Sequence, residues 1–513
     1  MATALDASPD PATNDDEAPR APLADAFVRG LAGIVGREHC LTSAEELFVY
    51  ECDGLTLDTV RPEVVVLPAS TDEVSRVVAL CAEHDVPVVP RGAGTGLSGG
   101  AHPVEGGIVV SLARMKAIVE IDVENRVAVV QPGLVNADLS KAIAEHGLFY
   151  APDPSSQLAC TIGGNVAENS GGPHTLKYGT TTDHVRALEL VRPDGAVIRI
   201  GSKVGPGLGL DLVGVVVGSE GTLCIVTEVT VELTPVPEAI ETLLAIFPDV
   251  VSACRCVGAI TLSGLVPAAL EILDRRTIEA VESSVYKAGL PRDAGAVLII
   301  ELDGADCELE AHTERIAELA REAGAHAFER ARNDAERAQF WKARKGAFGA
   351  MGRLAPDLYV HDAVVPRKKL PEVLAAVCEI GDRHGLKLSN VFHAGDGNLH
   401  PNISFDRRDK GELARVVAAG EEILQLCVDV GGVITGEHGV GTEKRDYMGM
   451  VFSDDDLAAM LRLREALDPG RRFNPGKLIP TTRFCAEANP KARGYDRVPF
   501  EDEATATDEV PFE

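Results

Sequence analysis

The first half of the chain alternates short apolar runs with stretches of helical periodicity. Ser70-Thr-Asp-Glu73 carries a capping signal, which predicts a helix that continues to His84. Asn136 is predicted to cap a second helix that reaches Gly147. Strands this frequent, with short helices between them, predict an α+β domain over residues 23–236. The apolar runs that predict its strands are 64–67, 86–89, 107–111, 127–131, 187–191, 197–200 and 223–233.

In the second half, longer amphipathic helices separate the strands, which predicts a second α+β domain over residues 237–470. The charged helix faces at 308–336 are expected to be solvated surface. Residues 471–485 are predicted to fold back onto the first domain. Strands are predicted at 243–247, 298–302, 359–363 and 391–393, and helices at 308–324, 369–385, 412–430 and 454–467.

The two ends of the chain, residues 1–22 and 486–513, are rich in acidic residues and alanine, which predicts disorder. The start has no apolar core of a secretory signal, and no window reaches the roughly 18 apolar residues of a membrane helix. We therefore expect a cytoplasmic protein without a transmembrane segment, for which peripheral membrane association stays open. A net charge of −30 argues against nucleic acid as a partner, because phosphate binding needs clustered Lys and Arg.

The 11 cysteines form neither Cys-x-x-Cys pairs nor the runs that hold iron–sulfur clusters. Most are expected to be buried, reduced side chains. An iron–sulfur electron acceptor would therefore belong to another chain.

A glycine-rich run, Pro90-Arg-Gly-Ala-Gly-Thr-Gly-Leu-Ser-Gly-Gly100, directly follows a predicted strand. Successive backbone N–H groups in such a run form a nest that binds anions. The pattern is neither a P-loop nor a Rossmann fingerprint, and by itself it also fits a flexible surface loop.

Two further runs rich in glycine and small polar residues follow at 152–172 and 217–223. Three such runs suit a long ligand with a pyrophosphate and a large ring system. Backbone amides would hold the pyrophosphate, and Asn, Ser and Thr side chains would reach the polar atoms of the ring.

The second half contains His393-Ala-Gly-Asp-Gly-Asn-Leu-His400 and Gly436-Glu-His-Gly439. Imidazole and carboxylate together form the ligand set of a divalent metal such as zinc or manganese. Either motif alone is more often structural. On an extended strand Glu437 and His438 would face opposite ways, whereas on a glycine-flanked turn both can point inward.

Several motifs resemble the FAD-linked oxidase family, which has the flavin fold of vanillyl-alcohol oxidase and p-cresol methylhydroxylase. They are Pro90-Arg-Gly-x-Gly-Thr-Gly96, Thr161-Ile-Gly-Gly-Asn165, Lys177-Tyr-Gly-Thr180 and Val217-Gly-Ser-Glu-Gly-Thr-Leu223. The second half resembles the branch that oxidises 2-hydroxy acids, above all the flavin subunit of glycolate oxidase and the D-lactate dehydrogenases. Phe340-Trp-Lys-Ala-Arg-Lys-Gly-Ala-Phe348 and Asn474-Pro-Gly-Lys-Leu-Ile-Pro480 carry that likeness. The resemblance implies an α+β FAD-binding domain in two parts with an α+β cap domain.

Carried over by position, the resemblance implies His393, His400 and Glu437 as ligands of a divalent metal, with Zn²⁺ ahead of Mn²⁺ and Fe²⁺. It implies His438 as the general base, with Arg344 and Asn402 contacting the substrate. Relatives with covalent flavin use a histidine in the first loop; this loop has none before His102, which implies non-covalent FAD. The residues implied to hold FAD are Pro90, Arg91, Gly92, Ala93, Gly94, Thr95, Gly96, Ser98, Pro152, Asp153, Thr161, Gly163, Gly164, Asn165, Ser170, Gly171, Tyr178, Gly179, Glu220, Gly221, Ile225 and Asn474.

Two departures from the family pattern bear on function. The segment 203–212 is longer than usual and lacks an aromatic residue, which puts the flavin packing there in doubt. Phe348 and Val360 stand where the dicarboxylate-using branch is expected to have Thr and Lys. Apolar side chains cannot pair a distal carboxylate, which favours a small monocarboxylate.

A 2-hydroxy acid chelates a metal through its carboxylate and hydroxyl, and the cation lowers the hydroxyl pKa. With His438 as base, the Cα hydrogen would leave as hydride to the flavin. The sequence and its resemblance therefore predict an FAD-dependent, metal-assisted dehydrogenase of glycolate or D-lactate, with another 2-hydroxy acid such as D-2-hydroxyglutarate as the alternative substrate. A metallohydrolase and a non-catalytic flavin-binding subunit are the alternatives of another class. The electron acceptor stays open between an iron–sulfur partner, a quinone, a cytochrome and an electron-transfer flavoprotein.

Overall fold

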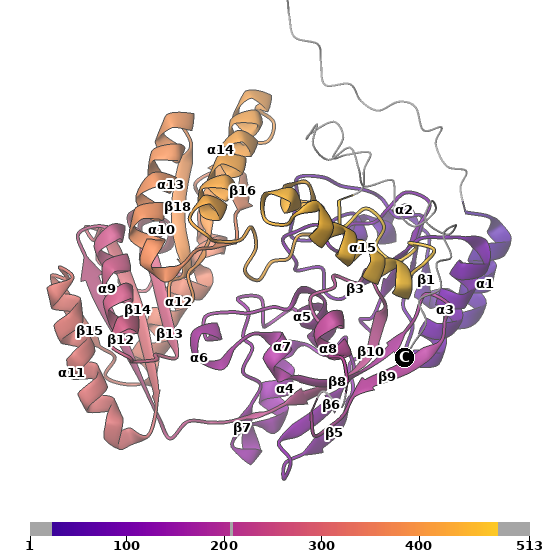
Figure 1. The fold of residues 1–513 in the computed structure, drawn as a ribbon, viewed down its shortest axis with the longest axis horizontal. Coiled ribbons are helices and arrows are strands. Elements are labelled where there is room, and N and C mark those ends of the chain that lie inside the picture. Colours follow the sequence, from indigo (N-terminus) through magenta and orange to yellow (C-terminus); the bar gives the residue numbers. More distant parts are fainter. Residues whose placement is uncertain (1–22, 206–208, 481–513) are drawn as a thin grey trace, which may run out of the picture.

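The computed structural model describes residues 23–205 and 209–480, and the acidic ends predicted to be disordered lie outside these ranges. The described chain forms two lobes, one from the first half of the sequence and one from most of the second (Figure 1). Among the described residues no helix is both long and apolar enough to cross a membrane.

The first lobe begins with a four-stranded sheet in the order β1-β2-β4-β3. Its strands β2, β4 and β3 run parallel. The predicted capping signal is confirmed at the start of α3, where the Ser70 hydroxyl accepts the N–H of Glu73. Helices α1 and α3 cover its apolar face. The elements are α1 (Asp25–Val35), β1 (Cys40–Leu41), β2 (Val64–Val66), α3 (Thr71–His84), β3 (Val88–Arg91) and β4 (Ile108–Ser111).

An antiparallel sheet of five strands, in the order β5-β6-β10-β8-β9, completes the first lobe. The prediction that Asn136 caps α4 is wrong, since Val135 occupies that position. The Asn136 amide is instead buried and donates to the Pro152 carbonyl and the Asn165 side chain. The elements are β5 (Ile118–Asp122), β6 (Val127–Val130), α4 (Asn136–Ile143), α5 (Ile162–Glu168), β8 (Val185–Val191), β9 (Val197–Gly201), α8 (Leu212–Val216) and β10 (Ile225–Glu232).

The second lobe is built on a nine-stranded sheet with helices on both faces (Figure 1). Alternation along β12 decides which face each side chain joins: Leu243, Ala245 and Phe247 pack with α9, α11 and α13, whereas Leu244 and Ile246 pack with α10 and α12. The elements are β12 (Ala239–Phe247), α9 (Val250–Leu262), β13 (Ala269–Asp274), α10 (Arg275–Glu282), β14 (Ala296–Gly304), α11 (Asp306–Glu322), β15 (Ala327–Arg330), α12 (Asp334–Met351), α13 (Leu370–His384), β18 (Lys387–His393), β19 (Asn398–Leu399), β20 (Pro401–Phe405) and α14 (Lys410–Asp429).

Polar residues interrupt the apolar pattern on the face of this sheet that carries α12. Glu271 of β13 and His393 of β18 are register partners and both are buried there. The predicted strand at 359–363 is split into β16 (Asp357–Val360) and β17 (Ala363–Val364), because His361 and Asp362 leave the ladder between them. These interruptions mark the region where the polar site is built.

The C-terminal segment after α15 (Asp454–Leu467) lies along the first lobe (Figure 1). Phe473 pairs with Val88 of β3 and joins the first lobe's core. Asn474 and Lys477 donate to backbone carbonyls of the 100–102 region, at 3.0 Å from Asn474 Nδ2 and 2.8 Å from Lys477 Nζ to the Gly100 oxygen. The end of the chain therefore forms part of the wall of the first lobe.

Replacing Phe473 by Ala is expected to destabilise the first lobe by about 3–5 kcal/mol, because it leaves a cavity where a fully buried aromatic ring packs. Phe48→Ala is the matched control, since that ring is 59% exposed and its loss is expected to cost less than about 0.5 kcal/mol. Denaturant-induced unfolding checks both variants, and equal midpoints would contradict the packing role of Phe473.

Candidate active site

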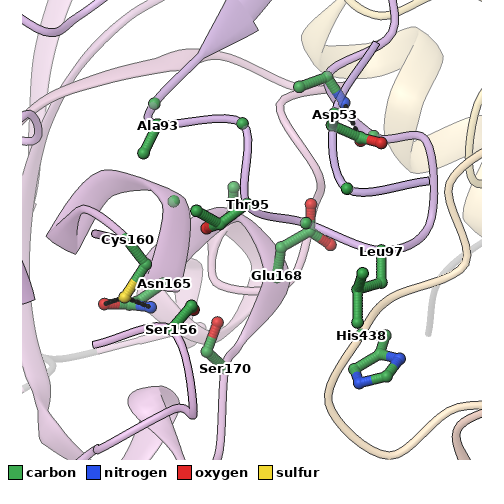
Figure 2. Close-up of a pocket in the computed structure, with 18 of the residues that line it drawn as sticks. Asp53, Ala93, Thr95, Leu97, Ser156, Cys160, Asn165, Glu168, Ser170 and His438 are labelled. Carbon is green, nitrogen blue, oxygen red and sulfur yellow. Dashed lines mark hydrogen bonds between the residues drawn. The ribbon is translucent and has the colours of Figure 1, made fainter. Parts of the chain in front are cut away.

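A cavity of about 550 Å³ lies between the two lobes. The first lobe supplies its glycine-rich loops, and the second supplies residues 356–360, part of α12 and the two histidine motifs. Figure 2 shows Ala93, Thr95, Asn165, Ser156 and Ser170 around the cavity, with His438 on the wall that the second lobe contributes. The three glycine-rich runs and the histidine motifs thus meet at one place.

The loop after β3 has the properties of an anion cradle. Within the described residues, the backbone N–H groups of Ala93, Gly94, Thr95 and Gly96 donate to no protein acceptor, although these residues line the cavity. The close packing requires glycine: a Cβ at Gly92 would lie 2.4 Å from Thr161 Oγ1, and Gly94 has φ +71°. Unpaired amides facing a cavity fit the pyrophosphate of a dinucleotide.

Most residues predicted to hold FAD line this cavity. They are Pro90, Arg91, Gly92, Ala93, Gly94, Thr95, Gly96, Thr161, Gly163, Gly164, Asn165, Ser170, Glu220, Gly221, Ile225 and Asn474. Within this group Arg91 also has a structural contact, since its guanidinium donates to the Cys52 carbonyl at 2.8 Å.

Six of the predicted FAD residues, namely Ser98, Pro152, Asp153, Gly171, Tyr178 and Gly179, are not among those that line the cavity. The Ser98 carbonyl accepts the N–H groups of Thr442 and Glu443, and the Tyr178 hydroxyl bonds to Asp303 of the second lobe. Ser98 and Tyr178 therefore contact the second lobe and not the cavity.

His393, His400 and Glu437 converge as the sequence predicts. The two Nε2 atoms lie 3.1 and 3.2 Å from the same Glu437 oxygen, and the imidazole rings stand nearly perpendicular, at 85°. On the other side of each ring, Nδ1 of His393 lies 2.8 Å from Glu271, and Nδ1 of His400 lies 3.1 Å from the His361 carbonyl. With a metal bound, a proton on each Nδ1 would leave both Nε2 lone pairs to the ion, which is the arrangement of metal-binding histidines.

The charges around this triad favour a cation. Burial alone would lower the pKa of His393, but the carboxylates of Glu271 and Glu437 raise it to about 10. Burial acts to raise the pKa of Glu437, yet His393 and His400 hold it well below its usual range. The donor set and its charge therefore fit a divalent metal held by two imidazoles and one carboxylate.

His438 stacks on His400, with ring centroids 4.9 Å apart and planes 3° from parallel, and it lines the cavity. Burial, together with His400 and Lys444, lowers its pKa to about 4 although Asp362 and Glu437 act in the opposite direction. Its Nδ1 is buried without a hydrogen-bond partner in the described part of the chain. A neutral imidazole with a free nitrogen can accept a proton at neutral pH.

Arg344 and Asn402, the predicted substrate contacts, are fully buried and are not among the residues that line the cavity. Arg344 forms an ion pair with Glu271, and its Nη2 lies 3.4 Å from His393 Nδ1. The Asn402 amide donates to the His400 carbonyl at 2.6 Å. Arg344 is next to His393 and Asn402 is next to His400, and the contact of both residues with substrate stays a prediction.

Several functional candidates escaped the sequence interpretation. Asp362 accepts the N–H groups of three successive residues in the 436–438 turn, and Glu271 contacts His393. Glu168 lines the cavity, where burial and the nearby Glu220 raise its pKa well above the usual range. Motif spacing could not reveal Asp362 or Glu271, because each is a lone acidic residue far along the chain from its partners.

His174 joins the two lobes. Its Nδ1 lies 2.8 Å from Asp153 of the first lobe, and its Nε2 lies 3.1 Å from Glu301 in β14 of the second. Glu301 also accepts bonds from Arg337 and Trp341 of α12. Burial alone would lower the pKa of His174, but its two carboxylate neighbours raise it to about 10.

Comparisons with known proteins match both lobes. A model of the FAD binding domain matches residues 62–201, and one of the FAD linked oxidases, C-terminal domain, matches residues 236–478. Glycolate oxidase subunit GlcD of Escherichia coli (strain K12) is 45% identical over 469 residues, covering 90% of this chain and 94% of the relative. D-lactate dehydrogenase of Anaerostipes hadrus is 35% identical over 426 residues, covering 82% and 90%.

A crystal structure of p-cresol methylhydroxylase with substrate bound superposes with a TM-score of 0.76 at 17% sequence identity, covering 88% of this chain and 96% of the other. The comparison confirms the α+β flavin fold with its cap domain that the motifs predicted.

Replacing His174 by Gln is expected to lower stability most at pH 5–6.5 and progressively less as pH rises towards 10. The pKa of His174 is raised from 6.5 to about 10 on folding, so its charged contribution is complete below pH 6.5 and disappears as pH passes 10. Burial raises the pKa of Glu301, but His174 and Arg337 bring it to about 2, so that carboxylate stays charged across this range. Calorimetric unfolding at several pH values checks the trend.

His146→Gln is the control, because this surface histidine has a carboxylate no nearer than 3.8 Å in the described structure. Its stability is expected to stay within about 0.5 kcal/mol of the unsubstituted protein. A pH-independent deficit in His174→Gln would contradict a charged link between the lobes.

Proposed function

The chain belongs to the family of FAD-linked oxidases, and from that premise we propose that it oxidises a small 2-hydroxy acid, glycolate or D-lactate, to the 2-oxo acid. The reaction uses non-covalent FAD and a divalent metal, Zn²⁺ first, with Mn²⁺ or Fe²⁺ as alternatives. The observation that carries the proposal is the convergence of two imidazoles, a carboxylate and the His438 ring at the edge of the cavity that the glycine-rich loops enclose.

The names of the relatives support this substrate class, since one is a glycolate oxidase subunit and another a D-lactate dehydrogenase. Both substrates have a hydroxyl next to a carboxylate, which together chelate a cation. A site with adjacent metal ligands and a neutral imidazole suits this pair of groups.

The first lobe's loops would hold FAD, with the amides of residues 93–96 at the pyrophosphate and Asn165, Thr95 and Ser170 near polar atoms of the cofactor. The non-covalent mode is supported by His102, whose Nε2 is 2.9 Å from the Leu55 carbonyl and which is not among the cavity-lining residues. Bound FAD would supply an acceptor for the hydride of the substrate's hydroxyl-bearing carbon, and a bound metal would supply a Lewis acid for the hydroxyl.

The chain's own residues position the reactants and move the proton. His393, His400 and Glu437 would hold the metal, and Glu271 and the His361 carbonyl keep the two imidazoles in the tautomer that presents Nε2. His438 accepts the hydroxyl proton at a ring nitrogen, because its buried imidazole is neutral at neutral pH.

The cavity wall next to His400 is apolar. The Phe348 ring centroid lies 6.4 Å from that of His400, and Leu358 and Val360 line the same cavity. Phe348, Leu358 and Val360 themselves offer no partner to a distal carboxylate, which favours a small monocarboxylate over D-2-hydroxyglutarate. A cation on the same helix as Phe348, Lys345, also lines the cavity but is exposed to solvent.

The electrons would leave to a separate acceptor, such as an iron–sulfur partner subunit. The relative from Escherichia coli is named as a subunit, which supports an assembly of several chains. We further propose a cytoplasmic location, for which the free and mostly buried cysteines of the described residues are the support.

The first test is an anaerobic visible spectrum of the purified, metal-loaded protein before and after addition of glycolate and then D-lactate. A flavin spectrum bleached by one of them is the expected result. An oxidised spectrum in the presence of both substrates, with the metal shown to be bound, would reject this substrate class.

Replacing His438 by Ala is expected to leave the flavin spectrum intact and to slow flavin reduction by about 10²–10⁴-fold, the usual contribution of a general base. Stopped-flow absorbance under anaerobic conditions measures the rate. Undiminished reduction would refute the assigned base while leaving the cofactor assignment in place.

Replacing Phe348 by Ala is expected to raise kcat/KM for 2-hydroxy acids with a longer side chain, relative to glycolate, by about 10-fold or more, because it opens the apolar wall beside His400. Phe340→Ala is the matched control, since Phe340 is on the same helix and is not among the residues that line the cavity. A specificity ratio that changes equally in both variants would remove Phe348 from the substrate wall.

A further inference from the structure

We propose that Asp362 is a positioning residue that presets the metal ligand Glu437 and the base His438 before any ligand binds. The carboxylate of Asp362 is fully buried and lies in the short break between β16 and β17. The inference rests on the proposed function, because it assigns Asp362 to the same metal site.

The hydrogen bonds of Asp362 gather the whole turn around one carboxylate. Its Oδ2 accepts the Thr435 hydroxyl at 2.6 Å and the N–H groups of Gly436, Glu437 and His438 at 2.9, 3.1 and 2.8 Å. Three successive amides that point at one anion fix the backbone of the turn. Asp362 therefore fixes the backbone from which the Glu437 and His438 side chains extend, and with it the direction of both side chains.

The break that contains Asp362 also holds the other side of the site. The carbonyl of the adjacent His361 lies 3.1 Å from His400 Nδ1, which keeps the Nε2 of that ring directed at Glu437. His361 thus positions the imidazole of His400 through its carbonyl. The next residue, Asp362, positions Glu437 through its side chain. This arrangement explains why the strand is interrupted here although its flanking residues, Val360 and Ala363, continue the apolar pattern.

An alternative role for Asp362 is a second metal site, because its carboxylate and ring nitrogens of His400 and His438 all lie within 4.8 Å of one another. Two observations favour positioning. Lys444 Nζ lies 3.7 Å from Asp362, so a fixed positive charge already neutralises the carboxylate. Four donors of the turn also surround Asp362 Oδ2, which leaves that oxygen no lone pair for an ion, and Oδ1 accepts a longer bond, at 3.3 Å, from the Glu437 N–H.

The turn is tied down from the opposite side as well. Lys444 Nζ donates to the Gly439 carbonyl at 3.5 Å, and the Gly439 N–H donates to Thr435 Oγ1 at 3.1 Å. The turn is therefore closed by side chains that do not line the cavity. Substitutions there change the direction of Glu437 and His438 without touching substrate or cofactor.

The test compares Asp362→Asn with Glu443→Gln in the full-length, flavin-loaded protein. The asparagine keeps the size of the side chain but removes its negative charge, and its NH₂ group replaces the oxygen that lies 3.3 Å from the Glu437 nitrogen. Glu443 is a matched control, because it is a buried carboxylate that lies 3.6 Å from the same Lys444. Calorimetric titration with Zn²⁺ and with Mn²⁺, in the absence of substrate, measures the dissociation constant of the metal.

We expect Asp362→Asn to weaken metal binding by about 10–100-fold, the usual effect of losing a residue that orients a ligand, and Glu443→Gln to change it by less than about 3-fold. The visible flavin spectrum is expected to be unchanged in both variants, because the FAD loops belong to the first lobe. Metal affinity in Asp362→Asn equal to that of the unsubstituted protein would overturn the inference. Failure of the unsubstituted protein to bind either metal would instead reject the metal part of the proposed function.

Loss of the flavin from Asp362→Asn would indicate that this variant does not fold. In that case the test uses the two variants Thr435→Ser and Thr435→Val instead. Serine keeps the hydroxyl that donates to Asp362, and valine removes it at nearly constant volume. Weaker metal binding in the valine variant alone supports positioning through Asp362. Equal metal affinities in the two variants would contradict it.

Discussion

The docking of residues 435–444 against the first lobe is the interaction on which the site depends. The Glu220 carboxylate of the first lobe accepts the N–H groups of Val440 and Gly441 at 2.7 and 2.6 Å. The Ser98 carbonyl accepts the N–H groups of the next two residues. The same segment contains Glu437 and His438, so the bonds that join the lobes also hold these two side chains at the edge of the cavity. Burial raises the pKa of Glu220, whereas the two amides act to lower it.

The site concentrates buried charge that an apolar core would avoid. Glu271 with Arg344 and Asp362 with Lys444 are buried pairs, and Lys477 has three oxygen acceptors although burial lowers its pKa to about 7. Buried ion pairs seldom add stability over apolar residues of the same size, because desolvation offsets their attraction. These pairs instead fix orientation. Each carboxylate satisfies its donors in one geometry, and that geometry orients the neighbouring side chain or turn: His393 for Glu271, and residues 436–438 for Asp362.

Local features of this structure, such as helices and glycine-rich loops, could be predicted from the sequence more fully than contacts between distant residues. The capping signal at Ser70 and the long helices follow from short-range patterns, and the glycine-rich loops were located by their composition. Asn136 misled because an asparagine before a helix usually caps it, whereas here its amide is used in a tertiary contact with Asn165. The interruption at His361 and Asp362 could not be read from periodicity, because only the approach of the 435–438 turn gives those residues partners. The motifs allowed the grouping of His393, His400 and Glu437 to be predicted, whereas the carboxylates of Glu271 and Asp362 next to them could not be predicted.

The position of the last described residues determines when the first lobe can be completed during synthesis of the chain. Phe473, Asn474 and Lys477 complete the wall of a lobe whose previous strand, β11 (Thr234–Pro235), pairs with β7 (Leu148–Phe149). At the usual pace of translation, the ribosome needs roughly 10–50 s to make the chain between these points. During that interval the nascent first lobe lacks part of its core and of its cofactor cavity, while the whole second lobe is synthesised. The cavity between the lobes therefore gains the part of its wall that contains Asn474 only when the polypeptide is nearly finished.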